Sequence, residues 1–145
     1  MTTDEETGLN GARTLTPDFL SGRLLLNLDS EEETSFSIGC AGGGDSDIVL
    51  RVGREPVLGK GLRVHLKGLR GGHSGIDINT GRGNAIQLLA RMLDIPVPYR
   101  LSKIAGGSKH NAIPREAFAE VVLEEKDVRA FKAEVEKRFA EIRFE

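Results

Sequence analysis

A histidine with possible catalytic use, His73, lies in the glycine-rich stretch LRGGHSGIDINTGRGN at residues 69–84. Glycines such as Gly72 and Gly75 let the backbone bend and approach a ligand closely. A neutral imidazole can donate or accept a hydrogen bond, and it titrates near physiological pH. A solvated histidine in an ordinary turn is the simpler alternative, and the loop by itself does not separate the two.

Regular elements are predicted on both sides of this loop. Leu62, Val64 and Leu66 alternate with polar residues, which is typical of a half-buried strand. After the loop, apolar residues fall on one face of a helix predicted over residues 84–94. A long loop held between two such elements is a favourable place for functional side chains.

Further elements are predicted along the rest of the chain. A strand is predicted at 99–104, a second polar loop at 105–115, a strand at 117–124 and then a helix whose apolar stripe is Val128, Phe131, Val135 and Phe139. With a further strand at 47–52, the order is strand, strand, helix, strand, strand, helix. This order predicts an α/β (α+β) fold of the split βαβ type, with an antiparallel sheet and two helices. A closing strand is expected to begin at 142–144.

The first third of the chain predicts a different domain. Residues 23–29 form a short apolar run suited to a strand of a covered parallel sheet, and residues 35–40 alternate like another strand. Asp29 ends the first run, at the strand end where open α/β sheets build their sites. The glycines at 42–44 mark a boundary. We therefore expect domains at 1–42 and 43–145.

Composition excludes several classes of function. The 145 residues carry a net charge of −2, which gives no reason to expect a nucleic acid partner. No apolar run is long enough to span a membrane, and the acidic N-terminus lacks the features of a signal peptide. One cysteine, Cys40, allows no intramolecular disulfide. These features predict a cytoplasmic protein without a membrane partner.

Five short motifs, taken together and in order, resemble the M20 family of zinc metallopeptidases, and more narrowly its aminoacyl-histidine (Xaa-His) dipeptidases. They are Thr3–Gly8, Leu26–Glu31, Gly39–Gly43, the His73 loop through Ala85, and Asn111–Arg115. The resemblance implies a catalytic α/β domain with two zinc ions, into which a lid, or dimerisation, domain is inserted. It also implies a dipeptide substrate and a homodimer formed through the lid.

In the catalytic part, the resemblance makes Glu5 the general base and makes Glu6 and Asp29 zinc ligands. These residue types suit the roles. Zinc binds carboxylate oxygens and lowers the pKa of bound water to about 7. A neighbouring carboxylate can take the proton of that water and pass it to the leaving amine.

In the lid, the resemblance makes His73 a group that polarises the scissile carbonyl, often across a dimer interface. It makes Asn111 a substrate contact and Arg115 a candidate for the substrate carboxylate. A donor aimed at the developing oxyanion stabilises the transition state, and a guanidinium fork matches a carboxylate.

The sequence departs from the family in its metal site. The family also uses an early His-x-Asp pair, a bridging Asp and a late His, whereas His65, His73 and His110 all fall in the lid-like part. Glu6 and Asp29 are too few for a zinc site. We therefore expect an internal fragment, inactive by itself, with a lid that lacks its last strand.

Other interpretations stay open. The chain could be a non-catalytic dimerisation or binding module, or part of another M20 member such as a carboxypeptidase or deacylase. Glu5 and Glu6 could be a solvated acidic terminus, and Asp29 and Asn111 could simply stabilise turns. Arg82, just before a predicted helix, could bind an anion there.

Overall fold

The computed structural model describes residues 8–24, 26, 33–39, 42, 44 and 46–143. The chain divides into two compact units, Met1–Val49 and Leu50–Glu145. The assignment of residues 1–42 to a catalytic domain and 43–145 to a lid stays a prediction.

The first unit contains little regular structure among its described residues. The short helix α1 spans Asn10–Arg13, and the 3-10 turn η1 spans Pro17–Phe19. The strand predicted at 35–40 is wrong for residues 35–39, which have no strand, and Phe36 and Ile38 are 100% and 101% exposed. An alternating segment forms a strand only where a neighbouring strand supplies hydrogen-bond partners and another layer covers its apolar face. The strand predicted at 23–29 lies mostly outside the described residues.

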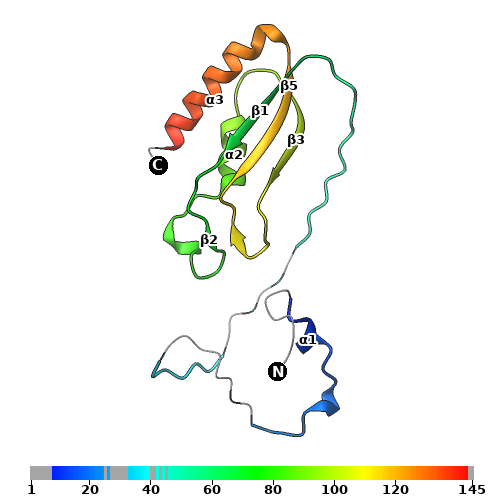
Figure 1. Ribbon diagram of the computed structural model, residues 1–145, viewed down its shortest axis with the longest axis vertical. Coiled ribbons are helices and arrows are strands. Elements are labelled where there is room, and N and C mark those ends of the chain that lie inside the picture. Colours follow the sequence, from blue (N-terminus) through cyan, green and yellow to red (C-terminus); the bar gives the residue numbers. More distant parts are fainter. Residues whose placement is uncertain are drawn as a thin grey trace. The chain divides into compact units, whose positions relative to one another are not determined.

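The second unit contains a three-stranded antiparallel sheet (Figure 1). Its strands are β1 (Lys60–Leu66), β3 (Arg100–Gly106) and β5 (Ala117–Leu123), with β5 in the centre. β1 and β5 pair from Lys60 opposite Leu123 to Leu66 opposite Ala117. A two-stranded ribbon joins β2 (Gly72–His73) to β4 (Ala112–Ile113). The predicted antiparallel α+β class is confirmed.

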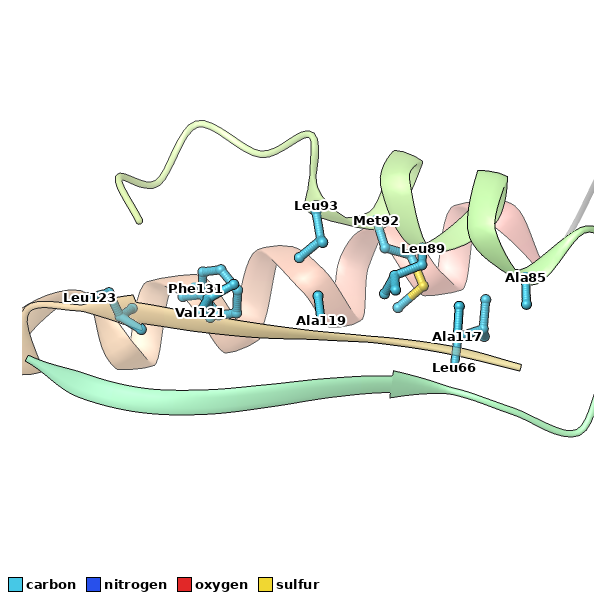
Figure 2. Close-up of a cluster of buried hydrophobic side chains, with 10 residues drawn as sticks. All are labelled: Leu66, Ala85, Leu89, Met92, Leu93, Ala117, Ala119, Val121, Leu123 and Phe131. Carbon is cyan, nitrogen blue, oxygen red and sulfur yellow. The ribbon is translucent and has the colours of Figure 1, made fainter. Parts of the chain in front are cut away.

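Helices α2 (Ala85–Leu93) and α3 (Val128–Ile142) cover the face of the sheet on which β5 buries alternate residues (Figure 2). Short 3-10 turns, η2 (Ile78–Thr80) and η3 (Glu125–Asp127), precede the two helices. The largest fully buried side chains are Phe131, Leu89 and Val121. Tyr99 packs edge-on against Phe131, with ring centroids 5.5 Å apart, and its hydroxyl donates to the Leu93 carbonyl at 2.8 Å. Burial, and then the charge of Asp94, raises the pKa of Tyr99.

The strand predicted at 47–52 is wrong. Residues 47–52 have no regular structure, and Ile48 and Leu50 are 93% and 80% exposed. Ladder hydrogen bonds stabilise a strand, and no strand pairing joins this segment to the sheet. At the other end, α3 continues to Ile142, the first residue of the range where the closing strand was expected to begin, and residue 144 lies outside the described residues. That the lid lacks its last strand stays a prediction.

Asn84 fixes the start of α2 and so fixes where the His73 loop ends. Its side-chain oxygen accepts hydrogen bonds from the backbone N–H groups of Ile86 and Gln87, at 3.0 and 3.3 Å. Asn84→Ala is expected to destabilise this unit by about 1 kcal/mol, because it removes the N-cap. Urea unfolding followed by circular dichroism measures the change. Asn84→Asp, which keeps the cap oxygen, should unfold near the wild-type midpoint, and equal losses in both variants would contradict the assignment.

Candidate functional site

The structure brings the two polar loops together. β2 pairs with β4, so that His73 lies opposite Ala112. The backbone N–H of Ser74 donates to the carbonyl of Asn111 at 2.9 Å, and that of Leu69 donates to the carbonyl of Arg115 at 3.3 Å. His73, Asn111 and Arg115 therefore belong to one cluster, although about forty positions separate His73 from the other two in the sequence.

The imidazole of His73 is oriented by its own loop. Its Nδ1 accepts hydrogen bonds from the backbone N–H groups of Gly75 and Ile76, at 3.0 and 3.4 Å. A neutral ring whose Nδ1 accepts must carry its proton on Nε2. His73 is exposed. The loop therefore presents Nε2–H as a hydrogen-bond donor on an accessible ring.

Asn111 and Arg115 lie on the other loop of this cluster. Asn111 is half-buried, and its backbone carbonyl accepts the hydrogen bond from the N–H of Ser74. Arg115 is exposed, and its aliphatic chain lies over Gly71 so closely that a Cβ at Gly71 would collide with its Cγ. Gly71 also has a φ of +67°, in the left-handed region that favours glycine. Its backbone can therefore turn beneath the aliphatic part of the Arg115 side chain without a side chain of its own in the way.

Two cavities adjoin this cluster, and the β4 segment contributes to the lining of both. One, of about 500 Å³, is lined by Ser74, Asn84, Lys109 and His110 among others. The other, of about 660 Å³, is lined by Arg115, Gly72, Arg63 and Phe118 among others. Ala112, Ile113 and Pro114 border both cavities. Arg115 thus places a cation at a cavity large enough for a small peptide.

The candidates of the predicted catalytic part, Glu5, Glu6 and Asp29, lie outside the described residues, as does Cys40. Within the described part of the chain, no group of three or more His, Cys, Asp and Glu side chains could hold a metal ion. Nor does any helix there have the length and apolar character needed to cross a membrane.

Sequence reasoning missed an ion pair inside the His73 loop. Arg82 Nη2 lies 2.7 Å from Asp77 Oδ1, and the side chains are 17% and 22% exposed. Arg82 Nη1 also donates to the Gly71 carbonyl at 2.7 Å. The anion site suggested for Arg82 is therefore wrong, because both terminal nitrogens already bind groups of the loop. Opposite charges in one glycine-rich stretch were the only signal in the sequence.

Comparison with known proteins gives consistent relatives. Residues 64–143 match the peptidase dimerisation domain of the M20 family. The chain is 44% identical over 128 residues to the cytosol non-specific dipeptidase of Escherichia coli (strain K12), covering 85% of this chain and 26% of the relative. It also matches the crystal structure of aminoacylhistidine dipeptidase from Vibrio alginolyticus, with a TM-score of 0.66 and 34% identity, covering 99% of this chain and 30% of that one.

The chain thus spans about a quarter to a third of the length of these two relatives. The family match covers β5, α2 and α3 together with the loops that carry His73, Asn111 and Arg115. The chain belongs to the M20 family through its peptidase dimerisation domain.

Proposed function

We propose that this chain forms the lid of a zinc-dependent dipeptidase that hydrolyses Xaa-His and other dipeptides in the cytoplasm. The observation that supports this most is the accessible Nε2–H donor of His73 on the β2–β4 ribbon, whose second strand leads to Arg115 at the edge of a cavity. The two relatives named as dipeptidases support the substrate class.

In this proposal the lid residues act on the substrate. His73 donates from Nε2 to the carbonyl oxygen of the scissile bond, whose negative charge grows as water attacks. Arg115 pairs with the terminal carboxylate of the dipeptide, because a guanidinium offers two parallel donors to a carboxylate. Asn111 contributes a further polar contact to the bound dipeptide.

The catalytic part completes the proposal. Glu5 acts as the general base for the attacking water, and Glu6 and Asp29 contribute oxygen ligands to a pair of zinc ions. Two carboxylates are fewer than the three protein ligands of a typical catalytic zinc site. Further ligands must therefore come from other parts of the enzyme.

A chimera tests the function. In it, this chain replaces the matched region of the E. coli dipeptidase. We expect the chimera to hydrolyse an Xaa-His dipeptide, to lose activity with a chelator and to recover it with zinc. Cleavage of N-acyl amino acids in place of dipeptides would favour a deacylase instead. A chimera that unfolds cooperatively and binds zinc, yet hydrolyses no dipeptide, would contradict the proposal.

The family description favours a second role, which is dimerisation. β1 and β3 are the outer strands of the sheet in the described part of the chain, and outer strands present backbone groups that can pair with another chain. We propose that the lid self-associates through such an edge. Light scattering of the purified chain checks this, and a monomer at high concentration would contradict it.

A further inference from the structure

Asp77 closes the loop that carries His73. One oxygen of its carboxylate, Oδ2, accepts from the backbone N–H of His73 at 2.9 Å. The backbone N–H of Asp77 donates in return to the carbonyl of His73 at 3.1 Å. Residues 73–77 are thus tied at both ends, and the N–H groups of Gly75 and Ile76 inside this turn are the ones that bind Nδ1 of the imidazole.

Arg82 fixes the Asp77 carboxylate from the opposite side. Its Nη2 binds the second carboxylate oxygen, Oδ1, while its Nη1 binds the Gly71 carbonyl. One guanidinium therefore connects the residue that precedes β2 to the turn that follows His73. Its rigid planar fork suits this task, since it makes both contacts in a fixed geometry.

Gly72 leaves the space that this arrangement needs. A Cβ at Gly72 would collide with Nη1 of Arg82 and lie 2.7 Å from Oδ2 of Asp77. Gly72 also has a φ of +154°, which L side chains rarely adopt. The pair thus lies directly against the backbone that precedes the histidine.

We propose that Asp77 and Arg82 are positioning residues for His73, which hold the imidazole as the Nε2–H tautomer with its donor facing outward. Removing either side chain lets residues 73–77 open, so that Nδ1 loses its two backbone donors and the ring takes either tautomer. The effect of these residues on the catalytic rate rests on the proposed function of His73. Their effect on the tautomer of the imidazole does not.

Nitrogen-15 NMR of the histidine rings tests the proposal on the whole chain. The chain has three histidines, and a His73→Gln variant assigns the signals of His73. With the imidazole rings in the neutral form, at alkaline pH, we expect wild-type His73 to show one protonated nitrogen, Nε2. Arg82→Met and Asp77→Asn should give a mixture of tautomers at His73 and leave His65 and His110 unchanged.

Two further variants distinguish positioning from a general loss of structure. Arg82→Lys keeps the charge but not the fork, so it should restore the tautomer only in part. Arg138→Met removes a half-exposed arginine that pairs with Glu141 at 3.1 Å on α3, and it should leave His73 as in the wild type. A single Nε2–H tautomer retained in Arg82→Met and Asp77→Asn would overturn the proposal.

In the chimera, Arg82→Met is expected to lower kcat about 10- to 100-fold with KM little changed, because a small misplacement of a catalytic group reduces the rate. Mixed tautomers with an unchanged kcat would leave the positioning role intact and contradict the role proposed for His73. An unchanged tautomer contradicts the positioning role, whatever the activity.

Discussion

His73→Ala is expected to lower the kcat of the chimera for an Xaa-His dipeptide by about 100- to 1,000-fold, the cost of removing one donor to an oxyanion. KM should change little, because the donor gains most of its strength as charge develops in the transition state. The structure supports this expectation with an Nε2–H donor that its own loop orients before any substrate binds. Steady-state kinetics over a range of substrate concentrations measures both constants.

The controls lie in the same loop. Asn79→Ala changes an exposed residue within η2 and should leave kcat near the wild-type value. His73→Gln keeps an N–H donor on a side chain of similar length, so part of the rate should return. A His73→Ala variant that raises KM with kcat unchanged would show that His73 only binds the substrate, and would contradict its proposed role in the transition state.

The lid fold was predictable because its elements carry strong local patterns. On β5, Ala117, Ala119, Val121 and Leu123 are buried and the residues between them are not, as the alternation required. On α3, the stripe of Val128, Phe131 and Val135 packs on the core, although Phe139 stays 39% exposed. In both elements, the period of the sequence matches a face that another layer covers.

The strand predictions failed at residues 35–39 and 47–52, because a strand also needs a partner that local sequence cannot show. Long-range pairing limited the site prediction in the same way. The ribbon that joins His73 to Ala112 has two residues on each strand. Such short strands show no alternating pattern of apolar and polar residues by which the sequence could predict them. The contacts of Asp77 and Arg82 depend on how the loop folds back over Gly72, which no pattern of residue types reveals.

Phe131→Ala is expected to produce the largest loss of stability, about 3–5 kcal/mol, because it leaves a large cavity between α3 and the sheet. Phe131 is 1% exposed and also supports the ring of Tyr99. The chain has one tyrosine and no tryptophan, so tyrosine fluorescence during urea unfolding follows this unit. Circular dichroism of the same samples checks that the signal reports unfolding.

Phe139→Ala is the matched control for this change, since it removes the same ring from the same helix at a position that is 39% exposed. We expect it to cost less than about 1 kcal/mol. If Phe131→Ala does not fold, Phe131→Leu should still unfold reversibly with a loss of about 1–2 kcal/mol, because leucine fills part of the cavity. Equal losses at Phe131 and Phe139 would show that α3 does not pack on the sheet through Phe131. Since α3 and α2 cover the same face, such a result would also remove the support for the helix that follows the His73 loop.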